Sequence, residues 1–156
     1  MKGNPKVIEL LNEALKDELM AVNQYFLHAE MCENWHYHKI SAYIKKQSID
    51  EMRHAEALIE RLLFLDGTPN LTQPMTLSIG QTVREQLQND LQAEADAVGM
   101  YNRMSRIARE EGDNVSRELF ERLLKDEEKH LDWLEAQMHQ IKELGYERYL
   151  SQQIEA

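Results

Sequence analysis

Acidic and imidazole side chains recur at one spacing in the two halves of the chain. A single shift in register superposes four pairs of chemically active side chains: Glu18 and Glu94, Tyr25 and Tyr101, Glu51 and Glu127, His54 and His130. Each half therefore reads as a glutamate followed, at the same distance, by Glu-x-x-His. Residues three apart on an α-helix lie about 60° apart around its axis, so both side chains of the motif can reach one site. Four carboxylates and two imidazoles suit two first-row divalent metals, with iron or manganese favoured over calcium.

The turn positions predict that these glutamates meet. Two residues of an antiparallel helical hairpin face each other when the turn lies midway between them. The midpoint of 18 and 51 falls at Asn34-Trp35, and the midpoint of 94 and 127 falls at Glu110-Glu111, next to a glycine. Both pairs should therefore lie at the same level of their hairpins.

The surroundings of the glutamates indicate burial. Glu18 has Leu11, Leu15 and Val22 at helical spacing, and comparable apolar residues flank Glu94 and Glu127. Unpaired burial of such charges would cost several kcal/mol each, so the site requires cations or shifted pKa values. Two divalent ions carry a charge that balances four carboxylates. One Glu-x-x-His motif would be unremarkable in an acidic helix, but two symmetric copies with apolar flanks predict a metal site.

The elements that must position this site are four long helices. Apolar periodicity, caps and glycines predict a first helix that begins at Asn4-Pro5 and breaks near 34–37, and a second helix that carries apolar residues from Ile40 to Leu65. They also predict a crossover over 68–81, helices over about 82–109 and 116–144, and a short helix or packed tail after Gly145. Asp66-Gly67 should end the second helix, with the glycine in a left-handed conformation. The prediction is an all-α, four-helix bundle with one long crossover connection and a short C-terminal fifth helix, formed as a single domain over 1–156.

Composition excludes several other classes of protein. The chain has 156 residues, a formal charge of -10 and one cysteine. The acidic balance argues against nucleic acid and anionic membranes as partners. One cysteine builds no intrachain disulfide framework, and the chain has neither a membrane-length apolar stretch nor the apolar core of a signal peptide. These features favour a cytoplasmic protein.

Several motifs resemble the ferritin-like di-iron family and, within it, the bacterioferritins. The resemblance spans essentially the whole chain, and the segments that carry it are Met1-Lys2-Gly3, Asn23 to His28, Ser48 to Met52 with His54-Ala55, Asn114 to Arg117, Asp132 to Glu135, and Tyr149-Leu150. The fold and activity that it implies are a ferritin-like bundle and an iron-storing ferroxidase, which oxidises Fe(II) with oxygen or peroxide.

The resemblance also implies roles for the repeated residues. Glu51 and Glu127 would bridge two iron ions per subunit. The remaining ligands would be Glu18 and His54 on one iron, and Glu94 and His130 on the other. Tyr25 lies two turns from Glu18 on the same helix face, where it could donate a hydrogen bond or an electron; a plain core tyrosine is the alternative.

Met52 follows a predicted ligand by one position, so it projects about 100° away from the bundle interior. Sequence alone is compatible with simple packing in a subunit interface. In the bacterioferritins the equivalent methionine ligates a haem b shared between two subunits on a twofold axis. The resemblance therefore implies a homo-oligomeric cage of 24 chains built from dimers, ferrous iron as substrate, and a ferredoxin-type electron donor.

One segment departs from the family pattern. Lys45-Lys46-Gln47 stands where the family usually has Tyr-His-Glu, which leaves Asp50 alone among the residues that bind an additional inner-surface iron. We therefore expect no strong inner-surface iron site. His36 and His38 flank the first turn and could bind metal, although surface histidines usually do not.

Three alternatives remain at this point. A haem-free ferritin would differ only in the role of Met52. A rubrerythrin-like di-iron peroxidase commonly carries a four-cysteine iron domain, which Cys32 alone cannot form. A helical scaffold whose charges are merely solvated would bind no iron at all.

Overall fold

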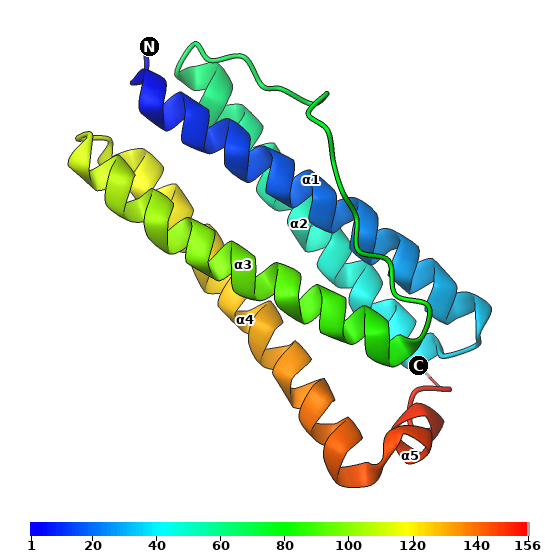
Figure 1. Cartoon of the computed structure of the whole chain (residues 1–156). Helices are drawn as coiled ribbons and strands as arrows, with labels where there is room; N and C mark the ends of the chain where they lie inside the picture. The colour runs from blue at the N-terminus through cyan, green and yellow to red at the C-terminus, as the bar shows by residue number, and fades with distance from the viewer. Residues whose placement is uncertain (156) are drawn as a thin grey trace.

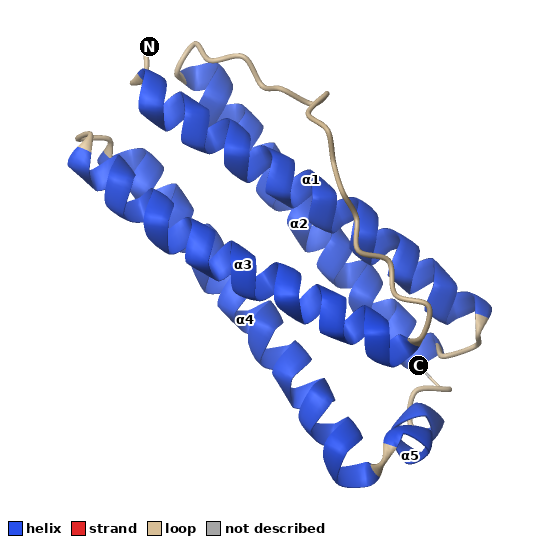
Figure 2. Ribbon diagram, in the orientation of Figure 1, coloured by secondary structure: helices blue, strands red, loops and turns tan. Residues whose placement is uncertain are grey.

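The computed structural model describes residues 1–155 and shows five helices and no strand in that part of the chain (Figures 1 and 2). The helices are α1 Pro5–Asn34, α2 His38–Phe64, α3 Val83–Glu110, α4 Asn114–Leu144 and α5 Tyr146–Ser151. The predicted four-helix bundle with a short C-terminal helix is confirmed, and the helix ends lie close to those predicted.

Two antiparallel hairpins make up the bundle. Contacts are most numerous between α1 and α2 and between α3 and α4, whereas the hairpins contact each other mainly through α1 and α3. Residues 65–82 run along α1 from the end of α2 to the start of α3, so that α3 is parallel to α2 (Figure 1). The predicted crossover is therefore present.

None of the helices in the described part of the chain has the length and apolar character needed to cross a lipid bilayer.

The end of α2 corrects one prediction. Asp66, not Gly67, takes the left-handed conformation, with a φ of 57°. The Gly67 N–H donates to Leu62 O at 2.8 Å, and a Cβ at residue 67 would lie 3.1 Å from Ile8 Cγ2. Glycine is needed here because α1 approaches closely.

A buried polar network holds the far end of the crossover. Asp90 Oδ1 accepts hydrogen bonds from Gln24 Nε2 at 2.9 Å and from His28 Nδ1 at 2.8 Å. The Gly80 N–H donates to His28 Nε2 at 3.0 Å. Because an amide N–H only donates, His28 Nε2 must be unprotonated, and the ring carries its proton on Nδ1, toward Asp90. His28 and Asp90 are fully buried, so the network fixes the crossover without solvent.

The apolar core forms two clusters. One includes Leu11, Leu15 and Phe120, and the other includes Ile44 and Leu134. Along α1, α2 and α4 the predicted ligands fall between these clusters. The core therefore holds a polar layer at mid-length of the bundle.

Candidate metal centre

The structure brings the six predicted ligands into one buried cluster. The four glutamates are 0–1% exposed and the two histidines 5–6%. Their ligand atoms form two overlapping groups, and within each group these atoms lie within 4.8 Å of one another: Glu18, Glu51, His54 and Glu127; Glu51, Glu94, Glu127 and His130. Glu51 and Glu127 belong to both groups, so the pseudo-twofold repeat of the sequence is also a repeat in space.

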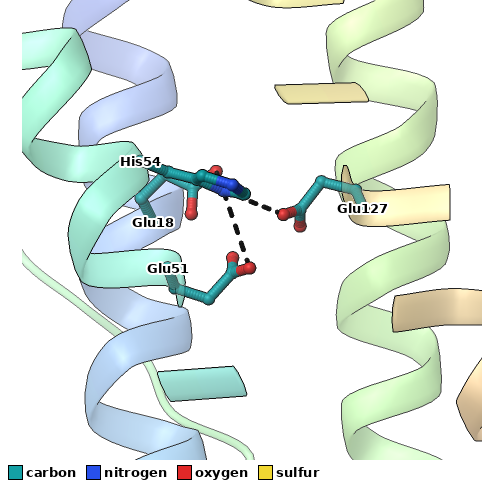
Figure 3. Close-up of side chains that lie close together, drawn as sticks. All are labelled: Glu18, Glu51, His54 and Glu127. Carbon is teal, nitrogen blue, oxygen red and sulfur yellow. Dashed lines mark ion pairs between the residues drawn. The ribbon is translucent and has the colours of Figure 1, made fainter. Parts of the chain in front are cut away.

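The first group has His54 at its centre. His54 Nδ1 lies 3.1 Å from Glu127 Oε1, 3.4 Å from Glu18 Oε1 and 3.7 Å from Glu51 Oε1. Figure 3 shows Glu127 approaching from the opposite hairpin toward the three residues on α1 and α2. The group therefore joins the hairpins.

The second group mirrors the first. His130 Nδ1 lies 3.0 Å from Glu51 Oε1, 3.3 Å from Glu94 Oε1 and 3.9 Å from Glu127 Oε1. Both histidines thus turn the same ring nitrogen toward the carboxylates, as two equivalent ligands would.

Two aspartates orient the histidines from outside. His54 Nε2 lies 3.0 Å from Asp126 Oδ2, and His130 Nε2 lies 3.3 Å from Asp50 Oδ2. Such a carboxylate fixes the ring and leaves Nδ1 for a metal. Asp126 was not predicted from the sequence, although the register shift that superposes the ligands also maps Asp50 onto it.

The two repeated tyrosines reach across between the hairpins. Tyr25 O–H donates to Glu94 Oε1 at 2.6 Å, and Tyr101 O–H donates to Glu18 Oε1 at 2.5 Å. The sequence places Tyr25 on the same helix face as Glu18 but does not identify its hydrogen-bond partner, which is Glu94 of the opposite hairpin. Tyr101 belongs to the same repeat but was given no role.

Burial and mutual repulsion shift the proton affinities of the bridging carboxylates. Burial, reinforced by the charge of Glu18, raises the pKa of both Glu51 and Glu127 well above the ordinary value. Burial also opposes ionisation of Glu18, but hydrogen bonding with His54 outweighs it and lowers the Glu18 pKa.

The surrounding carboxylates favour the protonated form of both imidazoles when no metal is bound. Burial would lower the pKa of His54, but hydrogen bonds with Glu127 and Glu18 outweigh it and raise the pKa to about 11. The pKa of His130 is also raised, because hydrogen bonding with Glu94 outweighs burial. A metal ion must displace these protons to reach Nδ1.

The chemistry of the donor set fits a pair of divalent ions. Six buried ligand atoms have no hydrogen-bond partner outside this cluster in the described structure: Glu18 Oε2, Glu51 Oε1, His54 Nδ1, Glu94 Oε2, Glu127 Oε1 and His130 Nδ1. Unpartnered buried polar atoms are costly and uncommon. Two divalent cations would satisfy them and balance the four carboxylates.

The other candidate residues lie outside this cluster. Met52 is 49% exposed on the outer face of α2, near Ile49 at 39%, and Phe26 of α1 is 53% exposed. The placement agrees with the predicted outward direction. The haem itself stays a prediction.

Neither His36 nor His38 belongs to a group of ligand atoms that could hold a metal within residues 1–155. His38 Nδ1 lies 3.0 Å from Glu33 Oε1 at the surface. Asp50 contacts His130, and the weakness of any inner-surface iron site remains a prediction.

Comparison with known proteins shows which family has this fold and sequence. Residues 8–144 match the family described as a ferritin-like domain. The chain is 45% identical over 152 residues to the bacterioferritin of Mycolicibacterium paratuberculosis, covering 97% of this chain and 96% of the relative. It is 48% identical over 149 residues to the bacterioferritin of Brucella melitensis, covering 96% and 92%. The solved structure of Mycobacterium tuberculosis bacterioferritin BfrA superposes with a TM-score of 0.97 at 44% identity, covering 99% of this chain and 98% of that one.

Proposed function

The chain belongs to the bacterioferritin family of ferritin-like iron-storage proteins, and we propose that its buried centre is a ferroxidase site. The observation that carries this proposal is the symmetric set of six buried ligand atoms without partners outside the cluster, supplied equally by the two hairpins. Burial of such a set in an apolar core is costly, and bound cations would lower that cost.

The geometry supports a distinct role for each ligand. Glu18 and His54 would hold one ferrous ion and Glu94 and His130 the other. Glu51 and Glu127, the shared members of the two groups, would bridge both ions.

The outer residues hold these ligands in place. Asp126 and Asp50 keep the Nδ1 atoms of the histidines directed inward. Tyr25 and Tyr101 each fix one carboxylate oxygen of the opposite hairpin by a short hydrogen bond. We also assign to Tyr25 the role of an electron donor that supplies one electron and its phenolic proton in place of a second ferrous ion; a later ferrous ion would reduce the resulting tyrosyl radical.

The proposed reaction balances without a further cofactor. Two ferrous ions lose two electrons, which with two protons reduce one oxygen molecule to peroxide or one peroxide to two waters. The carboxylates lower the cost of the higher charge on the ferric products. The ferric mineral would then be stored inside a cage of 24 chains, in the cytoplasm, each chain forming a single domain.

The haem belongs to the same proposal. Met52 is exposed on the outer face of α2 beside apolar side chains, which suits a subunit interface that shares a haem b. A haem held there by Met52 would supply electron-transfer chemistry for the release of stored iron, with a ferredoxin-type protein as donor.

Two variants test the centre. Glu94→Ala and His130→Ala should slow the absorbance rise on ferrous addition while leaving the assembly intact. Unchanged oxidation rates in both variants would remove the di-iron assignment.

Size-exclusion chromatography with absorbance detection tests the cage and haem. We expect a cage-sized peak with a Soret band, and Met52→Leu should lose that band while iron oxidation continues. A colourless dimer-sized peak would refute both cage and haem, whereas a colourless cage would indicate a haem-free ferritin.

A further inference from the structure

A pocket of about 370 Å³ opens on the face of the bundle between α2 and α4. His54 and His130 form part of its wall, so it is the solvent side of the metal centre. Its remaining wall is charged, with Asp50 and Asp126 among three basic side chains, Lys46, Arg53 and Lys129.

The two carboxylates of this pocket already have partners. Asp126 lies against His54 Nε2 at 3.0 Å and Asp50 against His130 Nε2 at 3.3 Å. One oxygen of each carboxylate therefore faces a metal-centre histidine, which offsets part of the negative charge on the pocket wall.

The three basic side chains have no such partner. Among residues 1–155 no ion pair involves Lys46, Arg53 or Lys129, whereas other arginines of the chain, such as Arg61 and Arg103, are paired. The Lys46 ammonium rests only over the Tyr43 ring, 5.9 Å from its centroid. A chain with a formal charge of -10 thus gathers three free cations around one pocket.

A second pocket between the same two helices shows the contrast. It is lined by Glu60 and Glu118 together with Arg61 and Arg122, so its acidic and basic side chains are equal in number. The surplus of free positive charge is a property of the pocket beside the metal centre.

We propose that this pocket binds a small oxyanion of the phosphate class, one per chain. An arginine fork and two ammonium groups match the charge and the hydrogen-bond acceptors of such an ion. Tyr43 lines the same pocket and is held by stacking on Trp133, with ring centroids 4.0 Å apart. Its hydroxyl adds a neutral donor.

The charge of Lys46 also opposes cations at the mouth of this pocket. Binding of the oxyanion there needs no iron, so it can be tested on the metal-free protein. Failure of this inference therefore leaves the ferroxidase proposal untouched.

The test is a calorimetric titration of inorganic phosphate into the metal-free assembled protein at low ionic strength. We expect saturable binding of one phosphate per chain, weakened at least tenfold in the double variant Lys46→Gln, Lys129→Gln. Lys45→Gln is the matched control, because Lys45 is the exposed neighbour of Lys46 and lies outside the pocket. It should retain wild-type affinity.

Two further measurements sharpen the result. Asp126→Asn removes a negative charge from the pocket wall and should tighten phosphate binding severalfold. Sulfate should displace the phosphate, whereas chloride at equal concentration should not.

Three results would overturn the proposal. They are binding that does not saturate, equal weakening by Lys45→Gln and by the double variant, and failure of sulfate to compete. Equal weakening by both variants would show only that phosphate is attracted to positive charge anywhere on the surface.

Discussion

A substitution at Glu51 can separate two effects of the buried centre: its cost to the stability of the metal-free protein and its role in iron binding. The Glu51 side chain is 1% exposed, its Oε1 has no hydrogen-bond partner outside the cluster, and burial together with the charges of Glu18 and Glu127 raises its pKa well above the ordinary value. The folded protein therefore forgoes the free energy of ionising Glu51, about 1.4 kcal/mol for each pH unit of the shift that lies below the pH of the experiment. Glu51→Gln keeps the shape and removes this cost but also loses the contact with His130, so we expect a net gain of about 1–3 kcal/mol for the metal-free protein.

This gain should be visible as a higher melting temperature. For a chain of this size, 1 kcal/mol corresponds to roughly 2–4 °C, so the metal-free variant should melt about 2–12 °C above the wild type at pH 7. Iron oxidation should fall in the same variant. Mutation of a residue that only hydrogen-bonds to a metal ligand typically lowers metal affinity or activity by about 10–100-fold. Glu51 belongs to both ligand groups, so we expect its substitution to lower the rate of iron oxidation by at least about 100-fold.

Gln47→Leu is the matched control for this variant. Gln47 lies one turn before Glu51 on α2, is 1% exposed, and has no partner for either amide atom. The internal repeat that pairs Glu51 with Glu127 maps Gln47 onto Leu123, so leucine already occupies the equivalent place in the other hairpin. Removal of two unpartnered buried atoms should stabilise the protein by about 1–3 kcal/mol while iron oxidation stays at the wild-type rate.

The assay combines scanning calorimetry of the metal-free proteins with stopped-flow absorbance after ferrous addition. A lower melting temperature for Glu51→Gln, or iron oxidation at the wild-type rate, would refute the prediction. A destabilised Gln47→Leu would show that the amide is satisfied in solution and that the expected gain from removing unpartnered atoms is unsound.

Three further predictions concern the tyrosines, the pH dependence and the crossover. Tyr25→Phe should slow iron oxidation more than Tyr101→Phe in the stopped-flow assay, and equal rates would contradict an electron-donor role. Burial and nearby carboxylates raise the pKa of Asp17 to about 7, and that of His54 is raised to about 11, so the folded state binds more protons than the unfolded state. The metal-free protein should therefore lose stability as pH rises from 5 to 9, and a melting temperature that rises over this range would disprove the assignment. His28→Ala removes the anchor of the crossover and should accelerate its cleavage by protease, whereas wild-type resistance would assign the anchoring to other contacts.

The clustering of the six candidate ligands was predictable because two independent signals agreed. The internal repeat identified the side chains, and the hairpin midpoints placed them at one level, so Glu18 could be matched to Glu51 from the sequence alone. Helical periodicity supplied the elements because each long helix buries one continuous stripe.

The hydrogen-bond partner of Tyr25 and the conformation of Gly67 could not be predicted from the sequence, for one physical reason. Tyr25 and Glu18 lie on one face of α1, but periodicity within a helix does not say which carboxylate of a neighbouring helix is closer, and the true partner is Glu94. The sequence predicted a left-handed φ for Gly67 because glycine favours that conformation. In the structure Asp66, whose residue type tolerates it, takes the left-handed φ instead. A side chain at residue 67 would be in tight contact with α1. Contacts between elements distant in sequence decided both cases.

The division into two hairpins has a mechanical consequence. Helix contacts are dense within each hairpin and sparse between α2 and α4, so we predict that the bundle opens most readily along the α2–α4 seam. Each ligand group takes residues from both hairpins. Bound iron would then hold the two hairpins at a fixed separation. Amide hydrogen exchange along the α2–α4 seam should therefore be slower in the iron-loaded protein than in the metal-free protein.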